Sequence, residues 1–146
     1  MLVQQILKLK DGGPGDVATI EPDKTVADAA AMLSRLRIGA LVVSPDGKTV
    51  EGILSERDIV RELGKSGDGC MNWKVADLMT REIVSCRPND KADQILAAMT
   101  EGRFRHLPVI RDGEMIGLIS IGDVVKARLS ELSMEKDALQ GLIAGY

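Results

Sequence analysis

The sequence is poor in aromatic residues and in the side chains that most often carry chemistry. Trp73, Phe104 and Tyr146 are the only aromatic residues among 146, and His106 is the only histidine. The core must therefore be aliphatic, and stacking platforms for single-stranded nucleic acid are missing. Two cysteines and one histidine do not give the ligand spacing of a structural zinc site. A disulfide between the cysteines is left open, but an aliphatic core of this size does not require one.

Excess positive charge and long apolar runs are also absent. The formal net charge is −3 and the basic residues are scattered, so no strong field favours DNA, RNA or anionic lipid. No stretch approaches the roughly 20 apolar residues of a membrane helix. The opening residues 1–8 are too short and polar for a secretory signal. We therefore expect a cytoplasmic protein without nucleic-acid or membrane partners.

What the chain does have is an internal repeat. Pro22 matches Pro88, an offset of 66 residues, and the apolar positions between residues 17 and 43 recur at the same offset. One residue is lost in a turn, and Gly-apolar-apolar-Ser-x-x-Asp then begins at both Gly52 and Gly117. A repeat in register over about sixty residues decides the architecture before any local pattern does.

Each half has the same predicted order of elements, β-α-β-β-α. Apolar residues at i, i+3, i+4 and i+7 predict the helices, and Asp-Gly between apolar runs predicts a hairpin. The second helix of each half begins after Ser55 or Ser120. The extended pieces are expected at residues 17–20, 40–44 and 50–54 in the first half, and at 83–86, 107–110 and 115–119 in the second.

The predicted fold class is α/β (α+β) with pseudo-twofold symmetry. One such half exposes an apolar sheet face, so we expect the two sheets to pack face to face, with helices outside and two clefts between the halves. The expected boundaries are an N-terminal helix and Gly/Pro linker at 1–15, the first motif at 16–66, a linker at 67–79, the second motif at 80–130, and a C-terminal helix extension at 131–146.

The N-terminal helix is predicted from Val3, Ile6 and Leu7, and residues 12–15 should end it. The C-terminal helix either folds back on its own core or forms a seam against a second subunit. Its short length favours the dimer. Its apolar positions are interrupted by Lys136 and comprise Val125, Leu129, Leu132, Leu139 and Ile143.

The duplicated plan resembles the cystathionine-β-synthase (CBS) domain family, and two motifs in one chain resemble a Bateman module of the stand-alone bacterial type. The resemblance covers about residues 2–130. It is carried by the two Gly-apolar-apolar-Ser-x-x-Asp segments, Leu107-Pro108-Val109, Asp112-Gly113 and the lead-in Asp77-Leu78-Met79-Thr80. It implies a homodimer whose clefts bind AMP, ATP or related adenosine compounds.

The resemblance also implies roles for individual residues. Asp58 and Asp123 would bind ribose, and Ser55, Ser120, Arg105 and His106 would contact phosphate. From spacing alone, Ser-x-x-Asp is equally a capping box at a helix start. Arg105 and His106 could equally be a solvated arginine and a structural histidine. The residues expected to line the adenine pocket, or simply to pack in strands, are Val17, Ala18, Ile20, Gly39, Ala40, Thr80, Ile83 and Val84.

Three classes of function follow from this pattern. The leading one is a non-catalytic regulatory module that binds AMP, ATP, ADP, NAD(H) or S-adenosylmethionine and signals energy or redox state to an effector on another chain. Catalysis is disfavoured because Glu56 and Asp58 are separated by Arg57, and the acidic residues at 90–93 lie at a polar helix start. The alternative is a ligand-free interaction or dimerisation module.

Overall fold

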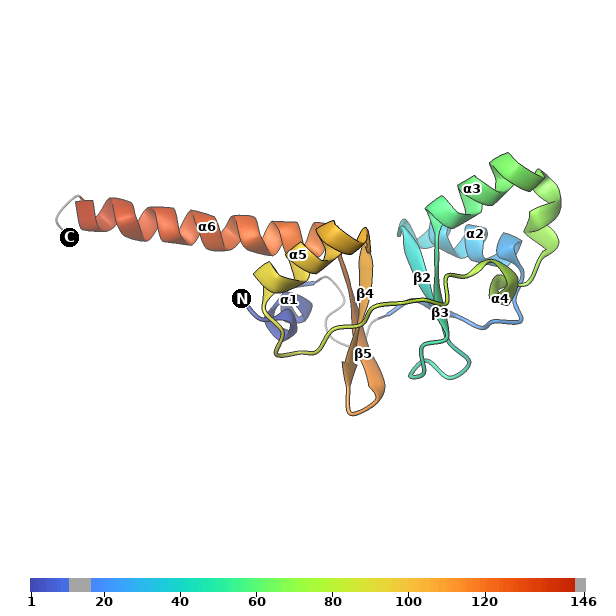
Figure 1. Cartoon of the computed structure of the whole chain (residues 1–146), viewed down its shortest axis with the longest axis horizontal. Helices are drawn as coiled ribbons and strands as arrows, with labels where there is room; N and C mark the ends of the chain where they lie inside the picture. Colours follow the sequence, from blue (N-terminus) through green and yellow to red (C-terminus); the bar gives the residue numbers. More distant parts are fainter. Residues whose placement is uncertain (11–16, 144–146) are drawn as a thin grey trace.

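The computed structural model describes residues 1–10 and 17–143, and two small sheets face each other at its centre with helices on the outer sides (Figure 1). This is the predicted α/β arrangement. The first repeat contains β1 (Thr19–Ile20), α2 (Val26–Leu36), β2 (Ala40–Val43), β3 (Gly52–Ser55) and α3 (Glu56–Ser66). Strand β1 pairs parallel to β2, and β2 pairs antiparallel to β3.

The second repeat contains α5 (Ala92–Gly102), β4 (His106–Arg111), β5 (Glu114–Ser120) and α6 (Ile121–Ile143). Strands β4 and β5 are antiparallel. The strand predicted at 83–86 is wrong as a regular strand. Only Cys86 pairs, parallel to Val109, at the place that Ile20 takes in the first repeat.

The two Asp-Gly turns differ in length. Asp112 and Gly113 both have positive φ, and Arg111 pairs directly with Glu114, so the second repeat has the tight hairpin that Asp-Gly favours. In the first repeat the loop is longer. There, Asp46 Oδ1 accepts hydrogen bonds from the backbone N–H of Lys48 and Thr49 at 2.8 Å. These bonds lower the pKa of Asp46 to about 2.

Each repeat is completed by a helix that belongs, in sequence, to the other repeat. We define residues 2–10 and 74–82 as the first and second lead-in segments. The first contains α1 (Val3–Leu9); the second follows the 3-10 helix η1 (Asp68–Asn72) and contains α4 (Val75–Leu78). The first packs in the core of the second repeat, and the second packs in the core of the first.

Equivalent hydrogen bonds hold the two lead-in segments. Val3 N donates to Asp90 O at 2.9 Å, and Val75 N donates to Lys24 O at 2.8 Å. Val3, Ile6 and Leu7 are buried, which confirms the predicted amphipathic helix. The predicted Gly/Pro stop at 12–15 lies outside the described residues. The repeat thus extends into the lead-in segments at a different offset, with Val3 equivalent to Val75.

Glycine makes room for each lead-in segment. A Cβ on Gly52 would lie 2.7 Å from Met79 Sδ and 2.8 Å from Thr80 O, and one on Gly117 would lie 2.7 Å from Leu7 Cδ2. The two glycines hold the same position in β3 and β5. At Gly52 the backbone carbonyl of Thr80 excludes a side chain, whereas at Gly117 a side chain would require Leu7 to shift.

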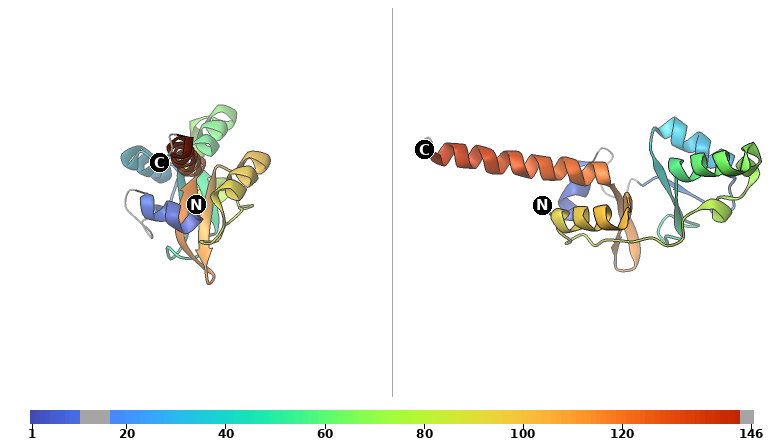
Figure 2. Two further views of the ribbon diagram at one scale, coloured as in Figure 1. Left: turned by 90° about the vertical axis from the view of Figure 1, so that its left-hand side faces the viewer. Right: turned by 45° about the horizontal axis from the view of Figure 1, so that its top comes forward.

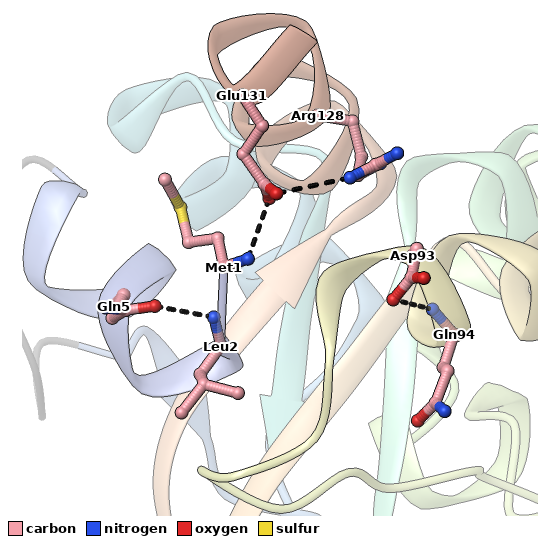
Figure 3. A network of polar contacts seen from close by, with 7 residues as sticks. All are labelled: Met1, Leu2, Gln5, Asp93, Gln94, Arg128 and Glu131. Atoms are coloured by element: carbon pink, nitrogen blue, oxygen red, sulfur yellow. Dashed lines mark hydrogen bonds and ion pairs between the residues drawn. The ribbon is translucent and has the colours of Figure 1, made fainter. Parts of the chain in front are cut away.

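Helix α6 begins in the core and then leaves it. Val124 and Ala127 are its buried residues, and the helix extends away from the body (Figures 1 and 2). Glu131 lies near the middle of α6, and its carboxylate pairs with two groups (Figure 3). Its Oε1 lies 2.9 Å from the Met1 amino group, and its Oε2 pairs with Arg128. Beyond this point α6 does not fold back on its own core, and Leu129 and Leu139 are 62% and 59% exposed.

Candidate functional site

The two Ser-x-x-Asp segments form equivalent capping boxes at the starts of α3 and α6. Ser55 N donates to Asp58 Oδ2 at 2.9 Å, and Asp58 N donates to Ser55 Oγ at 3.2 Å. Ser120 and Asp123 repeat this pattern at 2.8 and 3.2 Å. Both segments therefore do cap their helices. In each aspartate the capping box uses Oδ2 and leaves Oδ1 for other contacts.

A cleft of about 940 Å³ lies between the two repeats. It brings together the capping box of α3, the start of β4 with the loop before it, and residues 80–84 that follow the second lead-in helix. Nine residues predicted for the site from the sequence line it, namely Gly39, Ser55, Asp58, Thr80, Ile83, Val84, Arg105, His106 and Ser120.

Other predicted residues lie elsewhere. Ile20 and Ala40 are buried in the first repeat, where the Ile20 side chain is part of the core. Ala18 packs against the same core, and its carbonyl accepts a hydrogen bond from Val42 N. Val17 is half-buried at the entry to β1. Any role of these residues toward a ligand would use backbone groups, and it stays a prediction.

The sequence reasoning missed three arginines in the cleft lining. Arg57 and Arg61 extend from the first turns of α3, and Arg103 ends α5 in the left-handed conformation with φ of 59°. With Arg105 they place four guanidinium groups around a cleft that also contains the carboxylates of Glu56, Asp58 and Glu82. Arg57 could have been found, because its counterpart in the second repeat is Gly122. The guanidinium groups suit an anionic ligand.

His106 lies where the two repeats meet. A Cβ on Gly39 would be 4.0 Å from His106 Nε2 and 3.7 Å from Glu56 Oε1, so the small Gly39 admits both side chains. Burial lowers the pKa of His106, and Lys10 and Arg105 lower it further, against the opposing effects of Asp123 and Glu56. The imidazole is therefore neutral at pH 7 and offers the cleft a hydrogen bond rather than a charge.

Asp58 and Asp123 differ in their neighbours. The nearest cation to Asp58 is the exposed Arg61, with Nη1 3.7 Å from Oδ1. Asp123 Oδ2 lies 2.9 Å from the Lys10 Nζ, and Asp123 is not among the described residues that line the cleft. Burial opposes ionisation of Asp123, but the Ser120 N–H and Lys10 outweigh it and hold the pKa of the carboxyl below its usual value. The two predicted ribose sites are thus not equivalent.

The cysteines take no part in the cleft. Cys70 and Cys86 are both free and buried. Burial, with a smaller contribution from Asp90, raises the pKa of the Cys86 thiol to about 12, so the thiolate is scarce at neutral pH. Within residues 1–10 and 17–143, no three His, Cys, Asp or Glu side chains are grouped to hold a metal ion, and no helix is long and apolar enough to cross a membrane.

Comparisons with known proteins agree with this architecture. A family model described as the CBS domain matches the chain twice, over residues 15–65 and 75–130. The CBS domain-containing protein CBSX3, mitochondrial, of Arabidopsis thaliana is 39% identical over 127 residues, which cover 84% of this chain and 62% of that protein. The chain therefore spans less than two thirds of that relative's length.

Solved structures give the same result. The crystal structure of a CBS-domain-containing protein from Agrobacterium tumefaciens superposes with a TM-score of 0.82 at 41% identity, over 88% of this chain and 99% of that chain. A structure of CBSX2 in complex with AMP superposes with a TM-score of 0.72 at 28% identity, over 88% of this chain and 96% of that chain.

Proposed function

The chain belongs to the CBS-domain family, and from this premise we propose that it is a non-catalytic regulatory module that binds an adenine nucleotide in the cleft between its repeats. The observation that carries the proposal is the composition of that cleft. A helix-start carboxylate with one oxygen outside its capping box, Asp58, lies in the same cavity as four arginines and the backbone of residues 80–84. AMP bound to the similar CBSX2 supports the same ligand class.

Each part of an adenine nucleotide has a matching group in the cleft. The Asp58 carboxylate accepts hydrogen bonds and suits the two hydroxyls of ribose. Arg57, Arg61, Arg103 and Arg105, with the start of α3, suit phosphate. Thr80, Ile83 and Val84 provide apolar surface and backbone groups for the adenine ring. The same ribose is present in AMP, ADP, ATP, NAD(H) and S-adenosylmethionine. The chemistry of the cleft therefore points to an adenosine compound but does not distinguish among these five.

Regulation follows from the position of the cleft between two repeats. Asp58 belongs to the first repeat, whereas Arg105 and His106 begin the second. A ligand that contacts both sides favours one relative placement of the repeats, by the difference in its affinity for the alternatives. An effector on another chain would read that placement. We expect this to occur in the cytoplasm, although the similar CBSX3 is named mitochondrial.

The experiment is thermal unfolding with AMP, ADP, ATP, NADH and S-adenosylmethionine, and with guanosine counterparts. A ligand that binds only the folded chain stabilises it by about 2.7 kcal/mol at a hundred times its dissociation constant. Asp58→Ala should abolish the shift. Asp28→Ala is the matched control, because Asp28 forms the same capping box with Thr25 in α2 but does not line the cleft.

The outcomes separate the two leading functions. An adenosine-specific shift that survives Asp28→Ala and disappears in Asp58→Ala supports the nucleotide module. No shift with any compound at millimolar concentration supports the alternative, a ligand-free interaction module.

We further propose that the module is a homodimer in which α6 pairs with α6 of a second copy. Its exposed apolar residues have heptad-like spacing over residues 125–143, and a helix extension of this length is marginal in water without a partner. Lys136 lies in this stripe between Glu135 and Asp137. Neighbouring charges of opposite sign are self-complementary across a twofold axis, so a second copy fits this face.

A further inference from the structure

The two lead-in segments carry opposite charges at the same position. Val3 is equivalent to Val75, and Leu7 to Met79, because both members of each pair make the same backbone or glycine contact. In this register Lys10 is the counterpart of Glu82. Lys10 pairs with Asp123, and Glu82 lines the cleft that contains Asp58.

Lys10 is held by two groups of the second repeat. Its Nζ donates to Leu118 O at 2.6 Å and lies 2.9 Å from Asp123 Oδ2, which also accepts from Ser120 N. The side chains of Lys10 and Asp123 are 31% and 24% exposed. This is a partly buried, charge-assisted contact, stronger than an ion pair free in solvent.

Among the residues that the structure describes, Glu82 forms no equivalent contact. It is exposed and shares the cleft lining with Asp58, whose nearest cation, Arg61, is 3.7 Å away and itself 75% exposed. The Asp58 side chain is 16% exposed, so the two aspartates differ in their partners rather than in exposure: the cleft of Asp58 contains the carboxylate of Glu82, whereas Asp123 pairs with the ammonium of Lys10.

We infer that Lys10 is a built-in occupant of the Asp123 position, and that the chain therefore binds one nucleotide, at Asp58, instead of two. This inference rests on the proposed function and specifies its stoichiometry. The ammonium lies against Asp123 Oδ2, the oxygen that also caps α6, so this carboxylate is already paired with a cation, and a ribose hydroxyl would have to compete with Lys10 for it. A nucleotide would have to break the contacts of Lys10 to both Asp123 and Leu118, whereas the one ion pair of Asp58 within the described residues is with the exposed Arg61 at 3.7 Å.

The first test is isothermal titration calorimetry with AMP. Wild type should bind one AMP per chain, Lys10→Ala two, Asp58→Ala none, and the double variant Asp58→Ala/Lys10→Ala one. Lys8→Ala is the matched control, since Lys8 is an exposed lysine in the last turn of α1, two residues before Lys10, and it should keep one site. Far-ultraviolet circular dichroism confirms that each variant is folded. Two sites in wild type, or one site in both wild type and Lys10→Ala, would overturn the inference.

A charge exchange gives the reciprocal test. Glu82→Lys places an ammonium beside Asp58 and should weaken AMP binding at least tenfold. Lys10→Glu/Glu82→Lys should restore binding of one AMP, now abolished by Asp123→Ala and unaffected by Asp58→Ala. Binding that stays at Asp58 in the exchanged variant contradicts the inference.

A third measurement does not depend on a nucleotide. Lys10 in the folded wild type should react with acetic anhydride at least several-fold more slowly than Lys8, and Asp123→Ala should remove this protection. Equal rates in wild type would overturn the inference even if the chain binds AMP. If wild type binds no AMP but Lys10→Ala binds one, the inference stands and the proposed function at Asp58 fails.

Discussion

Gly52 and Gly117 show how a single residue sets the packing of the whole repeat. Neither is needed for a turn, and both lie in strands where any residue could satisfy the backbone hydrogen bonds. What each one lacks is a Cβ, and the space is taken by Met79 or Leu7 of a lead-in segment. Sequence reasoning treats these glycines only as part of a motif. Their physical role is visible only when the crossed lead-in segments are placed.

Gly52→Ala should therefore destabilise the protein by about 1–3 kcal/mol, because the added methyl meets the backbone carbonyl of Thr80 as well as Met79. Gly64→Ala is the control. Gly64 lies within α3 with nothing near its Cβ position, so alanine there should stabilise by about 0.5–1 kcal/mol. Urea unfolding of the two variants measures both. Equal effects would contradict the packing explanation.

His106 predicts a dependence of stability on pH. Its pKa is lowered in the folded state, so the folded protein binds fewer protons than the unfolded chain as the pH falls through the ordinary histidine value of about 6.5. Stability from the neutral imidazole is present above that value and declines below it. The free energy of unfolding should fall from pH 7.5 to 5.5, and His106→Gln should flatten this part of the curve. An unchanged slope in the variant would show that other groups dominate.

At the scale of elements, much of the fold could be predicted. Hydrophobic period and turn residues place α2, α3, α5 and the four strands of the two hairpins close to where they lie, because both signals are local. The length of the strand expected at 83–86 could not be predicted from local signals. Only Cys86 makes the parallel contact, with Val109 of β4, and the length of such a strand depends on the strand beside it. The crossed lead-in segments were missed because their pairing is not local.

The site shows the same limit. Motif and resemblance locate Asp58 and Arg105 in the cleft and assign both Asp58 and Asp123 to ribose, but they do not predict how the contacts of the two carboxylates differ. The difference comes from Lys10, which is more than a hundred residues away in sequence from both groups that hold it. No spacing pattern connects residues at that separation.

The exposed stripe on α6 predicts the assembly state. Leu132→Asp/Leu139→Asp should raise the dissociation constant of the homodimer about 100-fold or more, since each buried leucine contributes about 1.5–3 kcal/mol. Met134→Asp is the control, because Met134 is also exposed but lies off the stripe. Size-exclusion chromatography with light scattering reports the mass. A double variant that remains dimeric would place the interface elsewhere.

At the scale of the whole molecule, the crossed lead-in segments couple the repeats. Leu7 is buried in the second repeat and Met79 in the first, so truncation of either removes core from the repeat that is distant in sequence. Trp73 is the only tryptophan and lies beside the first repeat, where its carbonyl accepts from Val26 N. Its fluorescence therefore reports on the first repeat alone, whereas circular dichroism reports on both.

Leu7→Ala should lower the free energy of unfolding of the second repeat by about 2–5 kcal/mol. The unfolding transition followed by circular dichroism should then precede the transition followed by Trp73 fluorescence. Met79→Ala should reverse the order. Guanidinium titrations followed by both signals make the comparison. Coincident transitions in both variants would mean that the interface between the sheets, rather than each core, controls unfolding.

The crossing also bears on how such a chain could arise. A primitive gene with one lead-in segment and one repeat would encode a polypeptide unable to fill its own core, except by exchanging that segment with a twin. Duplication and fusion of the gene would then join two partners already entwined, and the exchange would become permanent within a single chain. Only after that fusion could the two copies diverge independently, one acquiring a lysine and the other a glutamate at the same ancestral position.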